Sequence, residues 1–79
     1  GEVDIVAREG DCVVFVEVKT HGDPGYLEWS VGPLKRHRII SASRRWLLAH
    51  PDSDSSYVRY DVVLMSGGRV EHIRDAFGD

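Results

Sequence analysis

The sequence predicts an α/β fold: a mixed β-sheet with one flanking helix, its elements following one another in the order β-β-α-β-β. Two pairs of strand-like runs lead to this prediction, one at residues 2–8 and 12–20 and the other at 57–66 and 69–74. Each pair is joined by a short glycine-containing turn, which is typical of a hairpin. Between the pairs, residues 33–50 carry apolar side chains at helical spacing, so a helix is expected on one face of the sheet.

The first hairpin is defined by its turn and by its alternating side chains. Gly at the first central position suits a type II′ turn, so Gly10 and Asp11 are expected to form the loop. That loop sets three facing pairs: Glu9 with Cys12, Asp4 with Glu17, and Glu2 with Lys19. It also places Val3, Ile5 and Ala7 on the fully apolar side of the second strand, and a slip by one residue would destroy this match.

The middle of the chain is expected to form a loop and then the helix. Residues 21–32 are rich in glycine and include Pro24, which is typical of a long loop. Pro33 suits the first turn of a helix. The broad stripe along the helix consists of Ile39, Ala42, Ser43, Trp46 and Ala49, with Lys35 on the same side. Pro51 and the Asp/Ser cluster at 52–56 are expected to end the helix.

The second hairpin follows at 57–66 and 69–74, with a Gly-Gly turn between its strands. In that register Asp61 lies opposite Arg74, and an inter-strand ion pair explains both residues more simply than catalysis does. The four histidines show no metal-ligand spacing, so no zinc site is expected.

Composition is that of an ordinary globular domain, with 42% hydrophobic and 29% charged residues. No run is apolar enough for a transmembrane helix, and no signal-peptide pattern is present. The single cysteine, Cys12, is expected in the core, which fits a reducing compartment and a cytoplasmic location. A chain of this size buries only about 60% of its unfolded surface, so dimerisation is a fair expectation. Gly1 stands almost at the start of a strand, which suggests that an N-terminal segment is missing.

Charge is unevenly distributed along the chain. The net charge is −3, yet the helix region holds five Lys and Arg residues and no Asp or Glu. Lys35, Arg36 and Arg38 are the candidates for contacts with DNA phosphates, although a solvated helix face explains them equally well. Tyr26 and Trp29 lie in the loop, where stacking on a base and packing onto the sheet are both open.

The end of the second strand carries the clearest chemistry. Asp4 and Glu17 face each other, which places their Cβ atoms about 4.5–5.5 Å apart, and like charges in such a pair destabilise a hairpin unless something compensates them. Mg²⁺ is suited to this, because it is typically held by one or two carboxylates together with water and phosphate oxygens. Lys19 points from the same face as Glu17, so its ammonium can stabilise a scissile phosphate, or help to orient or deprotonate the attacking water. Val18 can add its carbonyl only if the strand turns that oxygen toward the site. These parts suit phosphodiester hydrolysis.

The same residues have a simpler structural explanation. Glu17 and Lys19 can form an ion pair on one face at a strand end, with Asp4 solvated, and such pairs contribute about 0–1 kcal/mol. An E-x-K triplet alone favours this explanation. The apolar strand before it, and the register that brings Asp4 opposite Glu17, favour a metal site instead.

Three runs, GEVDIVAREGDCVVFVEVKT, VRYDVV and VEHIRDAF, resemble the YraN family of small bacterial proteins. That family is similar to the restriction-endonuclease-like superfamily with its PD-(D/E)XK motif, so the resemblance implies one restriction-endonuclease-like domain over the whole chain, 1–79. It assigns the motif's aspartate to Asp4, its second acid to Glu17, its lysine to Lys19 and a metal-binding carbonyl to Val18. Lys35 falls where the family has a lysine in the helix.

The resemblance implies an endonuclease that uses Mg²⁺ or Mn²⁺ to hydrolyse phosphodiester bonds of DNA or of a branched nucleic acid. Family members begin with a further helical segment before GE-[IV]-D, and similar archaeal Holliday-junction resolvases draw another metal-binding glutamate from such a helix. We expect this chain to lack that segment. The alternative is therefore an inactive nucleic-acid-binding or assembly module on the same fold, and a plain protein-interaction domain is a third hypothesis.

Overall fold

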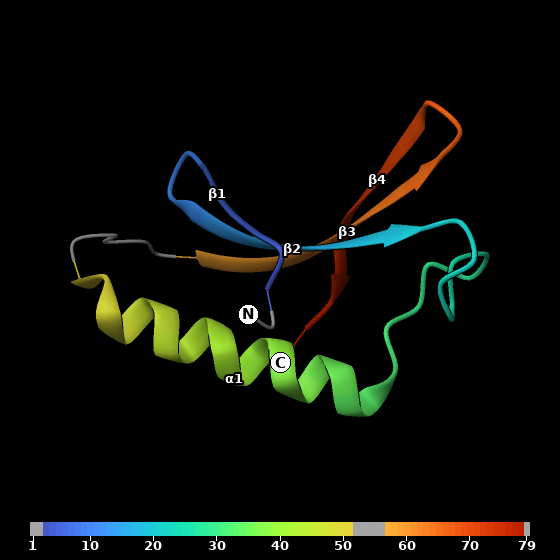
Figure 1. The fold of residues 1–79 in the computed structure, drawn as a ribbon. Helices are drawn as coiled ribbons and strands as arrows, with labels where there is room; N and C mark the ends of the chain where they lie inside the picture. The colour runs from blue at the N-terminus through green and yellow to red at the C-terminus, as the bar shows by residue number, and fades with distance from the viewer. Residues whose placement is uncertain (1–2, 52–56, 79) are drawn as a thin grey trace.

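Four strands and one helix make up the computed structural model, which describes residues 3–51 and 57–78 (Figure 1). Their bounds are β1 Ile5–Glu9, β2 Cys12–Thr20, α1 Pro33–Ala49, β3 Tyr57–Ser66 and β4 Arg69–Phe77. The strands form one sheet in the order β1-β2-β3-β4, in which β2 and β3 are parallel and the outer pairs are antiparallel. The predicted α/β class, mixed sheet and element order are therefore confirmed. No helix in this described part of the chain is both long and apolar enough to cross a membrane.

The first hairpin has the register that its turn predicted. Gly10 adopts a φ of 59°, and the pairs run from the loop back to Ile5 opposite Val16. The ladder stops there, so β1 begins later than its expected start at residue 2. The expected pairing of Glu2 with Lys19 lies outside the described residues.

The core lies between the sheet and α1, which runs across one face of the sheet (Figure 1). The buried apolar cluster consists of Val13, Phe15, Val31, Ile39, Tyr60, Val62 and Leu64. The Phe15 ring meets Trp46 edge-on at 5.8 Å and stacks on Tyr60 at 5.9 Å between ring centroids. Side chains alternate along a strand, so Glu17 and Lys19 point to the same helix-facing side as Phe15. The charged end of β2 is thereby placed beside the start of α1.

The helix buries most of its predicted stripe. Ile39 is buried and Trp46 is half-buried, whereas Ala49, expected on the same stripe, is exposed. At this end of the helix, the His50 ring stacks on Trp46 with 4.0 Å between ring centroids. The helix ends at Ala49, and the cluster at 52–56 that was expected to stop it lies outside the described residues.

The second hairpin contains a shift that the sequence did not predict. Its Gly-Gly turn has φ angles of 51° and 85°, as a type I′ turn requires. Val62 pairs with Ile73 in the predicted register, but the ladder then shifts so that Tyr60 pairs with Phe77. This β-bulge lets β4 continue beyond its expected end at residue 74.

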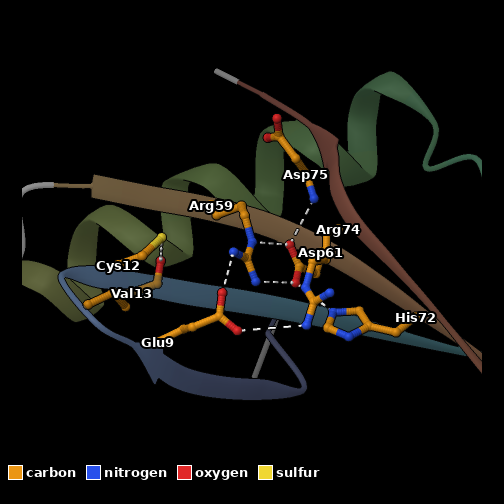
Figure 2. Close-up of polar contacts among 8 residues, drawn as sticks. All are labelled: Glu9, Cys12, Val13, Arg59, Asp61, His72, Arg74 and Asp75. Atoms are coloured by element: carbon orange, nitrogen blue, oxygen red, sulfur yellow. Dashed lines mark hydrogen bonds and ion pairs between the residues drawn. The ribbon is translucent and has the colours of Figure 1, made fainter.

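The bulge overturns the expected pairing of Asp61 with Arg74. The fully buried Asp61 carboxylate instead accepts hydrogen bonds from Arg59, from His72 and from the backbone N–H of Asp75 (Figure 2). Arg74 lies 3.7 Å from Glu9. Between these two pairs β4 has three residues where β3 has one, and the two extra residues move Arg74 away from the position opposite Asp61. Asp61 is thus an ion-pair residue, as predicted, but with a different partner.

Candidate functional site

Glu17 is almost entirely buried, with 5% of its side chain exposed. Lys35 reaches it from the first turn of α1, with Nζ 3.0 Å from Oε1. The other oxygen, Oε2, is buried and has no hydrogen-bond partner among the described residues. Burying a charged oxygen without a partner costs free energy, so a proton, a cation or a hydrogen-bond donor beside this atom would be stabilising.

Asp4 lies just before β1 and turns its carboxylate toward the edge of β2. Its Oδ2 accepts a hydrogen bond of 2.8 Å from the N–H of Val18. The backbone ladder ends at Ile5, so this side chain takes the place of the next backbone pair. Its negative charge also acts on Glu17, since it contributes to the raised pKa of that carboxyl. The hairpin register thus brings the two acids together.

The ionisation of Glu17 is set by opposing influences. Burial raises its pKa above the ordinary 4.5, the hydrogen bond from Lys35 opposes this shift, and the charge of Asp4 adds to it. The same hydrogen bond raises the pKa of Lys35. Glu17 therefore holds a proton more readily than an ordinary glutamate does, and a cation beside it would favour its ionised form.

Lys19 points to the same region but is held by the loop. Its side chain is buried, and Nζ donates hydrogen bonds to the carbonyl oxygens of Pro24, at 2.9 Å, and Ser30. Gly25 lies against this ammonium, because a Cβ added there would come within 2.8 Å of Nζ. The ion pair of Glu17 is thus made by Lys35 rather than by Lys19.

Side chains also satisfy the edge of β2 beyond the end of β1. Asp4 accepts the N–H of Val18, and Asp23 Oδ2 accepts the N–H of Thr20 at 2.8 Å. The N–H and C=O of one strand residue point toward the same neighbouring strand. The Val18 carbonyl therefore opens on the edge where Asp4 lies, which is the orientation that a carbonyl ligand needs.

A pocket of about 550 Å³ opens beside these groups. It is lined by Glu17, Val18, Lys19, Asp23, Pro24, Gly25, Glu28, Ser30, Gly32 and Lys35. Arg36 and Arg38 are exposed at the same end of α1 but are not part of this lining. In the loop, Tyr26 packs against the core, whereas Trp29 is 44% exposed. Four predicted site residues therefore line the pocket: Glu17, Val18, Lys19 and Lys35. Asp4 only borders it, through its hydrogen bond with Val18, and the two arginines lie outside it.

The donor set fits a hard divalent cation. Asp4 and Glu17 supply two carboxylates and Val18 a carbonyl, which are oxygen ligands of the kind that Mg²⁺ uses. Within the described ranges, no three or more His, Cys, Asp or Glu side chains come together in a way that could hold a metal ion. Mg²⁺ does not require one, since it usually keeps several waters and takes only one or two carboxylates from a protein.

Comparison with known proteins decides the family. The model of the uncharacterised protein family UPF0102 matches residues 1–65. The chain belongs to the UPF0102 family. A UPF0102 protein of Anaeromyxobacter dehalogenans is 45% identical and matches 98% of this chain over 61% of its own length. A UPF0102 protein of Alkalilimnicola ehrlichii is 40% identical and matches 98% of this chain over 63% of its own length.

The UPF0102 protein YraN of Escherichia fergusonii is 42% identical over the whole of this chain and 63% of its own length. The resemblance to the YraN family is therefore confirmed. The chain spans less than two thirds of the length of these UPF0102 relatives.

The UPF0102 family match includes every predicted site residue, because it extends from the start of the chain almost to the end of β3. Sequence reasoning missed the structural roles of Asp23 and Gly25. Asp23 follows Thr20 by three residues, a spacing at which an Asp side chain caps local backbone N–H groups. Gly25 has a φ of 78°, which a Gly beside Pro24 made plausible.

Proposed function

We propose that this UPF0102 chain carries the active site of a Mg²⁺-dependent endonuclease that hydrolyses phosphodiester bonds of DNA or of a branched nucleic acid. One observation carries the proposal: Glu17 Oε2 is buried without a hydrogen-bond partner among the described residues, within the field of Asp4. Two carboxylates in this relation are stabilised as anions by a cation beside them. The adjoining pocket, of about 550 Å³, has room for a phosphodiester group.

Asp4, Glu17 and the carbonyl of Val18 are the groups that would hold Mg²⁺ or Mn²⁺. When bound, such an ion polarises a phosphoryl oxygen and lowers the pKa of the attacking water. The protein's own contribution is positioning and charge. Asp4 holds the Val18 backbone in place at the strand edge, while the ammonium groups of Lys19 and Lys35 bring positive charge to the pocket.

Binding of nucleic acid is assigned to Lys35, Arg36 and Arg38. Their side chains are exposed at the start of α1, where the pocket opens. Each phosphate neutralised by such a side chain adds salt-dependent affinity, and DNA is the proposed partner. The proposal includes action in the cytoplasm and a homodimer, the latter because a domain of this size buries a small share of its surface.

Titration of Mn²⁺ or Mg²⁺ into the full-length protein, followed by calorimetry, tests the metal site. The wild type is expected to bind the ion, and Glu17→Ala is expected to abolish binding. Glu28→Ala removes an exposed carboxylate from the same pocket and serves as the matched control, with binding unchanged. Failure of the wild type to bind either ion rejects the metal. Cleavage of duplex and branched DNA by the wild type, Glu17→Ala and Lys19→Ala then tests the chemistry.

A second function has one observation in its favour. Lys35 neutralises Glu17 with an ion pair of 3.0 Å inside the protein, an arrangement that suits a module that binds nucleic acid without cleaving it. Metal-independent binding of DNA, lost in Lys35→Ala and Arg38→Ala and retained in Glu17→Ala, would favour this function over the endonuclease.

A further inference from the structure

The two lysines of the pocket have different surroundings. Lys19 is 7% exposed, and its ammonium is hydrogen-bonded to two backbone carbonyls of the 21–32 loop. The Lys35 side chain is 52% exposed, and its one ion pair within the described ranges is with Glu17. An ammonium has three N–H donors. The ammonium of Lys19 is therefore largely committed to the loop, whereas that of Lys35 is available to a ligand.

We propose that Lys19 is a positioning residue that fastens the 21–32 loop to β2, and that Lys35 supplies the ammonium that contacts the substrate phosphate. The first half is independent of any activity, because it concerns only the loop. The second half rests on the proposed function, since it assumes a phosphodiester ligand in the pocket.

The loop closes tightly around the end of Lys19. Gly25 has a φ of 78°, and a Cβ on it would stand 2.8 Å from Nζ and 2.7 Å from the carbonyl oxygen of Ser30. These contacts define a small cradle made of backbone, which accepts a compact ammonium. A guanidinium is larger and planar, so arginine is not expected to replace lysine at position 19.

Lys35 meets the requirements of a phosphate contact. It lies on the first turn of α1, lines the pocket and holds Glu17 at 3.0 Å. A phosphate held near the two acids would therefore lie within reach of the same ammonium. Because the Lys35 side chain is half-exposed, the larger guanidinium of Lys35→Arg has room, and this variant is expected to keep the phosphate contact.

Chymotrypsin digestion of the full-length protein tests the loop. Its cleavage sites in the loop are Tyr26, Leu27 and Trp29, and substitution of Lys19 or Lys35 leaves these three residues unchanged. Lys19→Met and Lys19→Arg are both expected to speed cleavage at these sites on the order of tenfold or more, because hydrogen bonds from charged donors are the strong ones. Lys35→Met is expected to leave the cleavage rate unchanged.

A glycine pair provides a second test that keeps Lys19 intact. Gly25→Ala places a methyl group in the cradle and is expected to speed cleavage as Lys19→Met does. Gly22→Ala is the matched control, since Gly22 has a φ of 102° but no atom within 4 Å of the added Cβ. Equal cleavage rates in the wild type, Lys19→Met and Gly25→Ala would overturn the role of Lys19.

Binding of a short fluorescein-labelled single-stranded oligodeoxynucleotide, measured in EDTA at several salt concentrations, tests Lys35. Removing one phosphate contact lowers the slope of log affinity against log salt by about 0.7 for a single strand. Lys35→Met is expected to show that loss, Lys35→Arg to restore the slope, and circular dichroism to show both variants folded. A slope unchanged in Lys35→Met overturns the assignment. If the wild type binds no oligonucleotide, the assignment fails together with the proposed function, while the chymotrypsin result still decides the role of Lys19.

Discussion

Asp61 Oδ2 lies 2.6 Å from His72 Nε2, and Arg59 Nε lies 2.8 Å from the other oxygen of the same carboxylate. Because Asp61 and Arg59 belong to β3 and His72 to β4, the contact joins the two strands beside the bulge (Figure 2). Arg59 continues the network to Glu9 at the end of β1. One buried carboxylate therefore organises the side chains of three strands.

Asp61→Asn is expected to destabilise the fold by about 3 kcal/mol. Removing one member of a buried ion pair leaves the other charge uncompensated, and Asp61 is fully buried. Urea denaturation followed by circular dichroism measures the change. Glu9→Gln is the matched control, because Glu9 contacts the same guanidinium from an exposed position, and its effect is expected to be much smaller. Equal stability of Asp61→Asn and the wild type would contradict the central place of this carboxylate.

The stability of the wild type is expected to fall in acid, and part of that fall belongs to Asp61. Burial raises the pKa of Asp61, but hydrogen bonds from Arg59, Asp75 and His72 outweigh burial and lower it below 3.8. As the pH drops, the unfolded state takes up this proton first. The stability that ionised Asp61 contributes is therefore complete above pH 3.8, and it is lost as the pH falls through the lower pKa of Asp61 in the folded protein. Denaturation midpoints over this range should fall less steeply in Asp61→Asn, and parallel curves for the two proteins would refute the linkage.

Glu17→Gln is expected to retain or increase stability near neutral pH, although it removes the proposed metal ligand. The pKa of Glu17 is raised above 4.5, mainly by burial, so the native state binds this proton more tightly than the unfolded state does. The stability that this group contributes is fully present below pH 4.5, and it falls as the pH rises through the pKa of Glu17 in the folded protein. Melting temperatures across this interval should decline in the wild type and not in Glu17→Gln. A variant less stable than the wild type at neutral pH would show that the ion pair with Lys35 outweighs burial.

Ser43 and Tyr60 form a buried hydrogen bond whose direction can be assigned. Ser43 Oγ donates its one proton to the carbonyl of Ile40 at 2.7 Å, so the Tyr60 hydroxyl is the donor in its own 2.7 Å contact with Ser43 Oγ. Tyr60→Phe is expected to cost about 1 kcal/mol. Ser43→Ala should cost more, about 1–3 kcal/mol, because it leaves the tyrosine hydroxyl buried without a partner.

A double-mutant cycle measures this pair. The combined variant, Ser43→Ala with Tyr60→Phe, is expected to lose less stability than the sum of its two single variants, because the unpaired hydroxyl is then absent. Strict additivity in urea denaturation would show that the two hydroxyl groups do not depend on each other.

Much of the fold was predictable because its signals are local. The runs at 12–20 and 57–66 have the predicted bounds, since Val-rich segments favour strands and the glycines before or after them permit the positive φ of tight turns. The same reasoning missed the bulge at Asp75, whose φ of 54° belongs to a residue type that adopts this conformation only occasionally. The error in the partner of Asp61 follows directly from it.

At the candidate site, side-chain periodicity predicted which face each group occupies but not where a long side chain ends. Glu17 and Lys19 do share a face, yet the ammonium of Lys19 turns into the 21–32 loop. The conformation of that loop depends on its own turns, which strand periodicity does not describe. Lys35 was correctly placed on the stripe that faces the sheet. Its contact with Glu17 depends on how α1 packs on the sheet, which no local pattern contains.

The two aspartates at the edge of β2 also affect whether a strand from another molecule can pair with this sheet. A strand edge with unpaired N–H groups invites a strand from another molecule and so favours aggregation. Here Asp4 and Asp23 already occupy the N–H groups of Val18 and Thr20. Their negative charges also repel the carbonyl oxygens of an incoming backbone. Addition of a strand from another molecule is therefore disfavoured along the stretch of edge that borders the pocket.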